Sequence, residues 1–341
     1  RHKRGSPSHY LLMSDNRTAL GIAAALAAAA GAAWFLKSRS QATKWLESDD
    51  VLAWIDRYDT FLLDCDGVVW RGDSVVPGVP EALAALKKRG KKVLYISNNA
   101  SKHRSAYMSK FKKMGIDACM EDVVTSALGA AKYFVGKYGK GAKVFVCGTE
   151  GLIQEFKEAG AHVVEPKYVT SETVCVGGPS MVEPGELDPE IRAIVAGADW
   201  NLNHRKISFS VLCLNMIPGC TLICTNRDRL FPAADGLQYP GAGATVAPLE
   251  VCSGQKGIDI GKPGPMLLDI LAETQGIDKK RTVMVGDRLD TDIMFGRGGG
   301  VDTLLVLTGC SDRAQADAAS GVRQPHFGIR SLGDLAAPLT K

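Results

Sequence analysis

A short apolar run that ends in two carboxylates and a glycine is the feature that most constrains this 341-residue chain. Residues 61–63 are Phe-Leu-Leu, and Asp64, Cys65, Asp66 and a glycine follow directly. An uncharged run of this length beside a glycine predicts a strand of a parallel sheet that is covered on both faces. Because side chains alternate along a strand, we expect Asp64 and Asp66 to share one orientation and Cys65 to point away. The run therefore predicts an α/β fold whose site lies at the carboxyl end of this strand.

Two carboxylates held side by side repel each other unless a cation or a proton lies between them. Asp64 and Asp66 therefore predict a site for a hard, oxygen-binding ion such as Mg²⁺. An isolated Asp-x-Asp-Gly is also a common cap of a helix or a turn, so the choice between the two interpretations depends on partners elsewhere in the chain.

Composition and charge exclude several classes of protein. The net charge is +4, but residues 1–46 hold seven basic side chains and one acidic one, so the rest of the chain is slightly acidic. The sequence has no basic body of the kind that binds nucleic acid, and we expect no nucleic-acid partner. Nine cysteines occur without a Cys-x-x-Cys spacing, which predicts neither a zinc site nor a disulfide framework.

Residues 18–36 form an uncharged, alanine-rich stretch that is followed by basic residues. The stretch is just long enough to span a bilayer, but alanine favours membrane insertion less than leucine, isoleucine or phenylalanine does. Its flanks are rich in basic residues and serine and poor in acids, as in organelle transit peptides. We therefore expect residues 1–46 to lie outside the fold, as a segment that contacts import machinery or a membrane. A chloroplast or another organelle is the favoured location, and a cytoplasmic or membrane-anchored protein is the alternative.

Polar residues follow two further predicted strands and one predicted turn. The strand over 92–97 ends in Ser97, Asn98 and Asn99, whose hydroxyl and backbone donors suit an anion. The alternative for these residues is an ordinary helix cap. Lys262 lies between a glycine and a proline that opens a predicted helix, and taken alone it is most simply a solvated surface lysine.

The second of these strands is predicted over residues 282–285. Asp287 at its end can complete the oxygen shell of a cation. Asp290 or Asp292 can cap the helix that follows. Carboxylates thus lie at the ends of two separate predicted strands.

The middle of the chain predicts a second α/β unit after a lysine- and glycine-rich stretch that is typical of a domain edge. The elements predicted in this unit are strands over 144–146, 173–176 and 222–224 and helices over 151–159 and 189–196. An insertion of this size between two halves of one sheet predicts a lid. We therefore divide the chain into the segment 1–46, a first core part 47–139, a cap 140–255 and a second core part 256–341.

Together, these motifs resemble the four motifs of the haloacid dehalogenase-like (HAD) phosphotransferases. The sequence is most similar to one branch, the phosphoglycolate phosphatase and p-nitrophenyl phosphatase family. The segments that carry the resemblance are DCDGVVWRGD, ISNNASKHR, CTNRD, PGAGATVAPLE, GKP and GDRLDTDI. It covers roughly residues 48–335 and implies a Rossmann-like core with a parallel sheet and a large α/β cap inserted between the second and third motifs.

The resemblance implies roles for individual residues of the core. Asp64 would be the nucleophile that takes up the phosphoryl group, and Asp66 the acid that protonates the leaving alcohol and later activates water. Mg²⁺ would lie on Asp64, the backbone carbonyl of Asp66, and Asp287. Asp292 would orient Lys262 or a metal-bound water.

The resemblance also implies how phosphate and substrate are held. Ser97, Asn98, Asn99 and Lys262 would hold the phosphoryl oxygens. Phe231 follows CTNRD at a place where members of the family differ, and we expect it to border the substrate.

The cap departs from the family pattern. Residues 199–206 read DWNLNHRK where relatives commonly have paired tyrosines before a lysine. Residues 230–245 are rich in glycine and proline, and loops of this kind at strand ends often carry specificity. A plain surface connection is the alternative interpretation of these residues. These departures weaken any transfer of cap contacts from a relative to this chain.

The sequence therefore predicts a magnesium-dependent phosphatase that hydrolyses 2-phosphoglycolate to glycolate and phosphate through an aspartyl-phosphate. The alternative enzyme is a p-nitrophenyl phosphatase-like hydrolase of many small metabolites, or a pyridoxal 5′-phosphate phosphatase. Two further alternatives are a phosphomutase and a non-catalytic binding protein of the same fold. The expected partner is a small phosphorylated metabolite. A homodimer is possible because relatives often pair through the cap.

Overall fold

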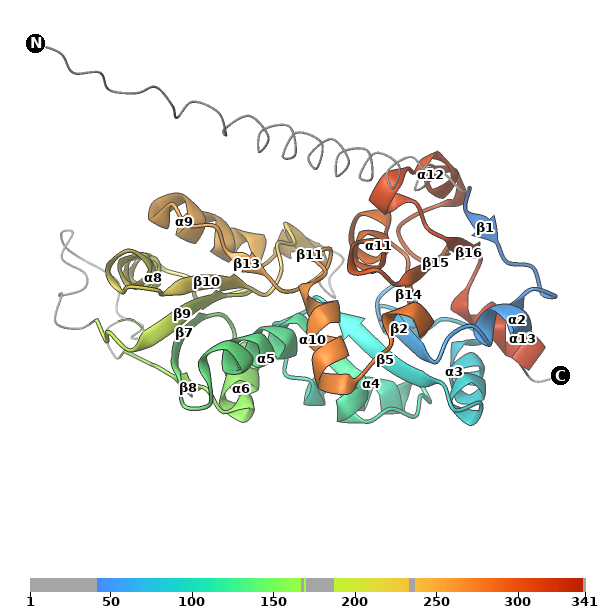
Figure 1. The fold of residues 1–341 in the computed structure, drawn as a ribbon, viewed down its shortest axis with the longest axis horizontal. Coiled ribbons are helices and arrows are strands. Elements are labelled where there is room, and N and C mark those ends of the chain that lie inside the picture. Colours follow the sequence, from blue (N-terminus) through green and yellow to red (C-terminus); the bar gives the residue numbers. More distant parts are fainter. Residues whose placement is uncertain (1–41, 167–168, 170–186, 233–236, 340–341) are drawn as a thin grey trace, which may run out of the picture. The chain divides into compact units, whose positions relative to one another are not determined.

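Seven parallel strands form the largest sheet of the described residues in this computed structural model (Figure 1). All of its neighbouring pairs are parallel. The predicted strand at residues 61–63 is confirmed as β2, which lies inside the sheet between β14 and β5 and is almost wholly buried. In sheet order the strands are β1 (Lys44–Trp45), β16 (Phe327–Ile329), β15 (Asp302–Val306), β14 (Thr282–Gly286), β2 (Thr60–Asp64), β5 (Lys92–Ser97) and β6 (Val123–Thr125).

Helices cover both faces of this sheet, so its central strands can be apolar on both sides. Phe61 and Leu63 pack into the cluster on one face, and Leu62 packs into the cluster on the other. The first face carries α2 (Val51–Ile55), α3 (Val79–Lys88), α4 (Ser105–Lys113) and α13 (Ala336–Leu339). The second face carries α5 (Ser126–Tyr138), α10 (Met266–Gln275) and α11 (Met294–Gly299). The short helix α12 (Arg313–Ala318) packs Ala316 against Leu305 of β15.

A second, five-stranded parallel sheet is inserted after β6, and the chain returns to the first sheet at β14. In order its strands are β13 (Ile258–Asp259), β10 (Thr221–Cys224), β9 (Ile191–Ala196), β7 (Lys143–Cys147) and β8 (His162–Val163). One face packs against α5 and α6 (Glu150–Ala159), and the other against α8 (His204–Met216) and α9 (Gly243–Ser253). The predicted core with a large inserted α/β cap is therefore confirmed.

The predicted division at residues 140 and 255 stays a prediction. Helix α5 packs on both sheets, so the apolar cluster runs without a break from the core into the cap. Strand β13 belongs to the second sheet although it follows residue 255.

One expectation about secondary structure and one about the extent of the fold were wrong. The helix predicted over 189–196 is instead the buried strand β9, because Ile191, Ile194 and Val195 fill both faces of the second sheet. β-Branched residues favour such a pleated, buried position over a helix. Residues 1–46 are predicted to lie outside the fold, but the last residues of this segment reach the first sheet, where β1 pairs with β16.

The structure describes residues 42–166, 169, 187–232 and 237–339. The alanine-rich stretch 18–36 and the predicted strand 173–176 therefore lie outside the described residues. None of the described helices has the length and apolar character needed to cross a membrane. Two antiparallel ribbons complete the described strands: β3 (Trp70–Arg71) with β4 (Ser74–Val75), and β11 (Leu230–Pro232) with β12 (Gln238–Pro240).

Candidate active site

The predicted polar residues of the core meet at the carboxyl edge of the first sheet. Strand β2 pairs with β14 on one side and with β5 on the other, in a register that aligns Leu63 with Val285 and Asp64 with Ile96. All three strands are parallel, so their carboxyl ends lie at one edge, where ligands bind in open α/β sheets. The register therefore brings Asp64, Asp287 and Ser97 to the same edge.

Lys262 is the centre of this group and is not a surface lysine, because only 3% of its side chain is exposed. Its Nζ lies 2.5 Å from Asp64 Oδ1 and 2.8 Å from Asp292 Oδ1, and it donates a 3.2 Å hydrogen bond to the carbonyl of Ile96. Burial alone lowers the pKa of Lys262, but Asp292 and Asp64 outweigh it and raise that pKa above its ordinary value. The ammonium therefore stays charged and bound to both carboxylates.

Asp64, Asp287 and Asp292 each offer a carboxylate oxygen within 4.8 Å of the others. With Lys262 they form what we call the charged cluster. Burial raises the pKa of Asp64 above its ordinary value; Lys262 opposes this, and Asp292 and Asp287 add to it. One lysine thus faces three carboxylates. This excess of negative charge, presented by oxygen atoms alone, is what a hard divalent cation binds.

Asp287 and Asp292 are held by backbone amides. Asp287 Oδ2 accepts a 2.7 Å hydrogen bond from the amide of Cys310. Asp292 lies in a π-helical turn, η4 (Leu289–Ile293), and its Oδ2 accepts from the amides of Asp287 and Arg288 at 3.2 and 3.1 Å. These bonds fix both carboxylates before any ligand arrives.

Glycines allow two loops to approach Asp287 closely. A Cβ on Gly309 would overlap with Asp287 Oδ2. A Cβ on Gly67 would lie 2.6 Å from the same oxygen, and Gly67 also has a φ of +87°, which side chains rarely adopt. The glycine that follows Asp66 is therefore required by the packing around Asp287.

Asp64 is the carboxylate of the charged cluster that a substrate can reach. Its side chain is 15% exposed, whereas that of Asp292 is 1% exposed. Asp66, two residues on, is exposed, and the intervening Cys65 is buried in the core, as the alternation along a strand predicts. Trp70 Nε1 donates a 2.9 Å hydrogen bond to Asp66 Oδ1 and so fixes that carboxylate at the mouth of the site.

The three polar residues after β5 differ in what they contact. Ser97 Oγ accepts from Tyr107 Oη at 3.0 Å and from the amide of Asn99 at 3.2 Å, which leaves its own proton to donate. Asn99 is exposed, and its Oδ1 closes a local turn by accepting from the amide and hydroxyl of Ser101. For Asn99 the side chain therefore acts as a turn cap.

Asn98 holds the loop of Lys262. Its Oδ1 accepts from the amide of Lys262 at 2.9 Å, and its Nδ2 donates to the carbonyl of Lys262 at 2.8 Å and to Asp228 Oδ2 at 3.3 Å. The carbonyl of Asn98 in turn accepts from Ser126 Oγ and Asn226 Nδ2. With its amide group occupied in this way, Asn98 positions Lys262 and connects it to the CTNRD segment of the cap.

Asp228 and Asn226 are contacts that the sequence interpretation did not assign. They belong to the CTNRD segment, which begins at the end of β10 just as Ser97, Asn98 and Asn99 begin at the end of β5. Burial raises the pKa of Asp228 above its ordinary value, and the hydrogen bond from Asn98 opposes the rise. A polar segment directly after a predicted buried strand was the available signal.

The side chains of a second group of possible ligands, His103, Glu155 and Glu158, are already engaged in hydrogen bonds. Arg104 Nε donates to both oxygens of Glu155 at 2.9 and 3.0 Å. His103 Nε2 lies 3.0 Å from Glu158 Oε2. This group therefore links α4 and α6, and the charged cluster is the better candidate for a cation.

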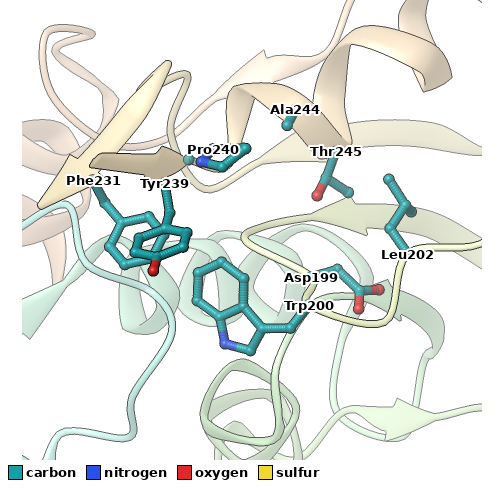
Figure 2. A pocket seen from close by; sticks show the side chains of 9 residues that line it. Asp199, Trp200, Leu202, Phe231, Tyr239, Pro240, Ala244 and Thr245 are labelled. Atoms are coloured by element: carbon teal, nitrogen blue, oxygen red, sulfur yellow. The ribbon is translucent and has the colours of Figure 1, made fainter. Parts of the chain in front are cut away.

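Phe231 lies in the wall of a pocket of about 640 Å³ in the cap (Figure 2). The ring of Phe231 lies 5.0 Å from that of Trp200 and 5.9 Å from that of Tyr239, centroid to centroid. We call this the aromatic pocket; its lining residues are Asp199, Trp200, Leu202, Phe231, Tyr239, Pro240, Gly241, Ala244 and Thr245. That Phe231 borders the substrate stays a prediction.

Known proteins match the chain over both core parts. Residues 61–162 match the family described as haloacid dehalogenase-like hydrolase, and residues 259–335 match one described as HAD-hydrolase-like. The protein named phosphoglycolate phosphatase 1A, chloroplastic, of Arabidopsis thaliana is 36% identical over 310 residues, which are 88% of this chain and 82% of that protein.

Solved structures show the same relationship. A 4-nitrophenylphosphatase of Thermotoga maritima has a TM-score of 0.69 and 31% identity, over 83% of this chain and 97% of that one. A glycerol phosphate phosphatase of Mycobacterium tuberculosis in complex with magnesium has a TM-score of 0.67 and 28% identity, over 82% and 77%. The chain therefore belongs to the haloacid dehalogenase-like hydrolases, in the phosphoglycolate phosphatase and p-nitrophenyl phosphatase family, and is a phosphoric monoester hydrolase.

Proposed function

We propose that this phosphatase forms an aspartyl-phosphate on Asp64 and depends on Mg²⁺. The observation that carries the proposal is the buried ion pair between Lys262 and Asp64, with Asp287 and Asp292 beside it. A fixed cation next to a nucleophilic carboxylate stabilises the negative charge that a phosphoryl group brings to the site. The same arrangement orients the attacking oxygen.

Asp64, Asp287 and the backbone carbonyl of Asp66 are the ligands that we propose for Mg²⁺. Both oxygens of Asp292 are engaged, one with Lys262 and one with backbone amides. Asp287 Oδ1 is buried and, among the described residues, has no hydrogen-bond partner, so it fits a cation ligand. When bound, Mg²⁺ supplies positive charge that stabilises the phosphoryl oxygens during transfer.

The chain's own residues supply two proton transfers and a nucleophile. In the first step an oxygen of Asp64 attacks phosphorus, the bond from phosphorus to the alcohol oxygen breaks, and Asp66 gives that oxygen its proton. In the second step Asp66 takes a proton from a water that attacks phosphorus, which releases phosphate and restores the Asp64 carboxylate. Lys262 and the free proton of Ser97 bind the phosphoryl oxygens in both steps.

Two kinds of substrate have support. 2-Phosphoglycolate is supported by the name of the Arabidopsis relative, and the word chloroplastic in that name agrees with an organelle address in residues 1–46. A ring-bearing ester, such as p-nitrophenyl phosphate or pyridoxal 5′-phosphate, is supported by the aromatic pocket. The organelle address and a homodimer remain predictions.

Phosphate release from these three esters tests the proposal, with Mg²⁺ and with EDTA, for the wild type and for Asp64→Asn. We expect EDTA to abolish release and added Mg²⁺ to restore it. Because the substitution removes the nucleophile, we expect Asp64→Asn to lower kcat/KM by about 10³-fold or more for each ester. The matched control is Asp269→Asn on α10, an exposed carboxylate paired with Lys279, which we expect to keep wild-type activity.

Activity that survives Asp64→Asn would refute the aspartyl-phosphate. Activity that is indifferent to EDTA and Mg²⁺ would refute the metal. Phosphate that moves to a second sugar rather than to water would identify a phosphomutase instead.

A further inference from the structure

Asp66, the proposed proton donor, is bound by a residue that has no role in the proposed mechanism. Trp70 Nε1 donates a 2.9 Å hydrogen bond to Asp66 Oδ1. An indole N–H can only donate, so Oδ1 must accept whether Asp66 is charged or neutral. The proton of a neutral Asp66 therefore lies on Oδ2. Among the described residues Oδ2 has no hydrogen-bond partner, so it is the oxygen that remains for the leaving alcohol.

A closed turn returns Trp70 to the side of Asp66. The carbonyl of Cys65 accepts from the amides of Val69 at 2.9 Å and of Trp70 at 3.1 Å. The carbonyl of Trp70 accepts from the amide of Gly67 at 2.7 Å. The backbone therefore sets the position of the indole relative to the carboxylate before any ligand binds.

Helix α4 holds the indole from another side. Tyr107, Lys110 and Phe111 lie three and four residues apart, so they share one face of this helix. The ring of Phe111 meets that of Trp70 edge-on, with the centroids 5.2 Å apart, and Trp70 is only 1% exposed. Tyr107 Oη donates to Ser97 Oγ at 3.0 Å. One helix face thus supports both the indole beside Asp66 and the hydroxyl that is proposed to bind phosphate.

A cation lies over the same indole. Lys110 Nζ is 4.2 Å from the centroid of the Trp70 ring. A cation on the face of an aromatic ring is attracted to it, and it polarises the N–H that donates to Asp66. Lys110 therefore strengthens the hydrogen bond to Asp66 without touching the carboxylate.

We propose that Trp70, with Lys110 on its ring, is a positioning residue for the general acid, because it holds Asp66 with the transferable proton on Oδ2. As an oxygen of Asp64 bonds to phosphorus and the bond from phosphorus to the alcohol oxygen breaks, this proton passes from Oδ2 to the alcohol oxygen. In the second step Oδ2 takes a proton from the attacking water. The inference rests on the proposed function, because Asp66 is the acid of the same reaction.

The basicity of the leaving group separates this role from a merely structural one. A strongly basic leaving oxygen needs the proton of the acid, whereas p-nitrophenolate leaves readily without it. Phenyl phosphate and p-nitrophenyl phosphate have similar shapes and differ in this basicity. Because kcat/KM covers the steps up to the departure of the alcohol, the test compares its loss for the two esters.

Trp70→Phe keeps an aromatic ring and removes the N–H. We expect kcat/KM to fall about tenfold for phenyl phosphate and at most about twofold for p-nitrophenyl phosphate, since only the first ester needs the aligned proton. Asp66→Asn is the reference, with an expected loss of about 10²-fold or more for phenyl phosphate and a much smaller one for p-nitrophenyl phosphate.

The matched control is Trp54→Phe, because Trp54 belongs to the same apolar cluster as Trp70 and its buried Nε1 has no hydrogen-bond partner among the described residues. We expect this control to keep the wild-type kcat/KM for both esters. Equal losses for the two esters in Trp70→Phe, beside a selective loss in Asp66→Asn, would overturn the inference and leave the proposed function intact. Equal losses in Asp66→Asn as well would show that Asp66 is not the acid, and both proposals would then be wrong on this point.

Lys110→Met decides the question if Trp70→Phe does not fold, because it keeps the indole and removes the charge above it. We expect kcat/KM for phenyl phosphate to fall about threefold, and that for p-nitrophenyl phosphate to keep its wild-type value, as the donor is weakened. Lys112→Met, at an exposed lysine of the same helix, is the control and should change neither value. A Lys110→Met enzyme without a selective loss for phenyl phosphate would then overturn the inference.

Discussion

The charged cluster and the aromatic pocket are built in opposite ways. In the charged cluster, Asp64 at the end of β2 and Asp292 in the turn η4 pair with one lysine at 2.5 and 2.8 Å. In the aromatic pocket, rings on a loop and on the ribbon of β11 and β12 leave much of their surface in solvent. The first region is suited to phosphoryl transfer, which is common to every ester, and the second to a choice among esters.

The two regions also differ in what a substitution costs. Removing one partner of a buried ion pair leaves an uncompensated charge and destabilises a protein by about 3–5 kcal/mol. Truncating a half-exposed ring costs less, because much of its area never left water. Changes in the charged cluster should therefore lower both the stability of the protein and the turnover of all esters. Changes in the pocket should alter the ratio of the kcat/KM values of different esters.

Lys262→Met is the substitution with the largest expected effect on this comparison. The change leaves Asp64 and Asp292 buried without their cation. We expect kcat/KM to fall about 10²–10³-fold for ring-bearing esters and for 2-phosphoglycolate alike. We also expect the free energy of unfolding, measured in urea without Mg²⁺, to fall by about 3–5 kcal/mol.

Lys279→Met is the matched control, because Lys279 pairs with Asp269 on the surface. An exposed pair contributes about 0–1 kcal/mol, so stability and activity should hardly change. If Lys262→Met instead changed the ratio between esters more than it changed their common rate, the proposed separation of the two regions would be wrong.

Asn98→Ala should affect both regions at once, since Asn98 contacts the backbone of Lys262 and the side chain of Asp228. We expect kcat/KM to fall about tenfold for every ester, as a hydrogen-bonded support of the catalytic lysine is lost. We also expect the ratio between esters to change, because the pocket wall is connected to the same amide. Steady-state kinetics on phenyl phosphate and 2-phosphoglycolate measures both.

The neighbouring Asn99→Ala provides the comparison. Its side chain is exposed and closes a turn on Ser101, so a loss of at most about threefold is expected. A larger loss from Asn99→Ala than from Asn98→Ala would restore the original prediction, in which the Asn99 segment binds phosphate directly.

The charged cluster could be predicted from the sequence because the end of a buried strand is visible as a local pattern of residues. An apolar run followed by a polar residue marks both a buried strand and the edge where its neighbours end. Asp64, Asp287 and Ser97 were assigned in this way, and parallel pairing then brings them together. Lys262 was recovered only from the resemblance, since a lone lysine between glycine and proline carries no sign of burial.

The pocket could not be predicted in the same way. Its rings come from two separate segments: Trp200 from the loop after β9, and Phe231 and Tyr239 from the ribbon of β11 and β12. Their meeting depends on how α8 and the ribbon of β11 and β12 pack, which no local pattern specifies. The wrong helix over 189–196 has a related cause: burial in the second sheet decided the conformation, and the local pattern did not.

Asp228→Asn should give the smallest effect, on stability alone. Burial raises the pKa of Asp228, although Asn98, Arg288 and Lys262 oppose this. The folded chain therefore keeps this proton over a pH range in which the unfolded chain has lost it, so the carboxyl lowers stability as pH rises through that range. We expect Asp228→Asn to melt at a higher temperature than the wild type at pH 8, and the two to converge towards pH 4.

Asp290→Asn is the control in the same region, because its expected change in melting temperature at pH 8 has the opposite sign. The hydrogen bond from Arg288 lowers the pKa of Asp290, so its charge stabilises the folded state above the ordinary pKa and that contribution is lost as pH falls. The substitution should lower the melting temperature at pH 8, although little, because the pair is exposed. If both variants shifted the melting temperature in the same direction at pH 8, burial would not be what sets the titration of Asp228.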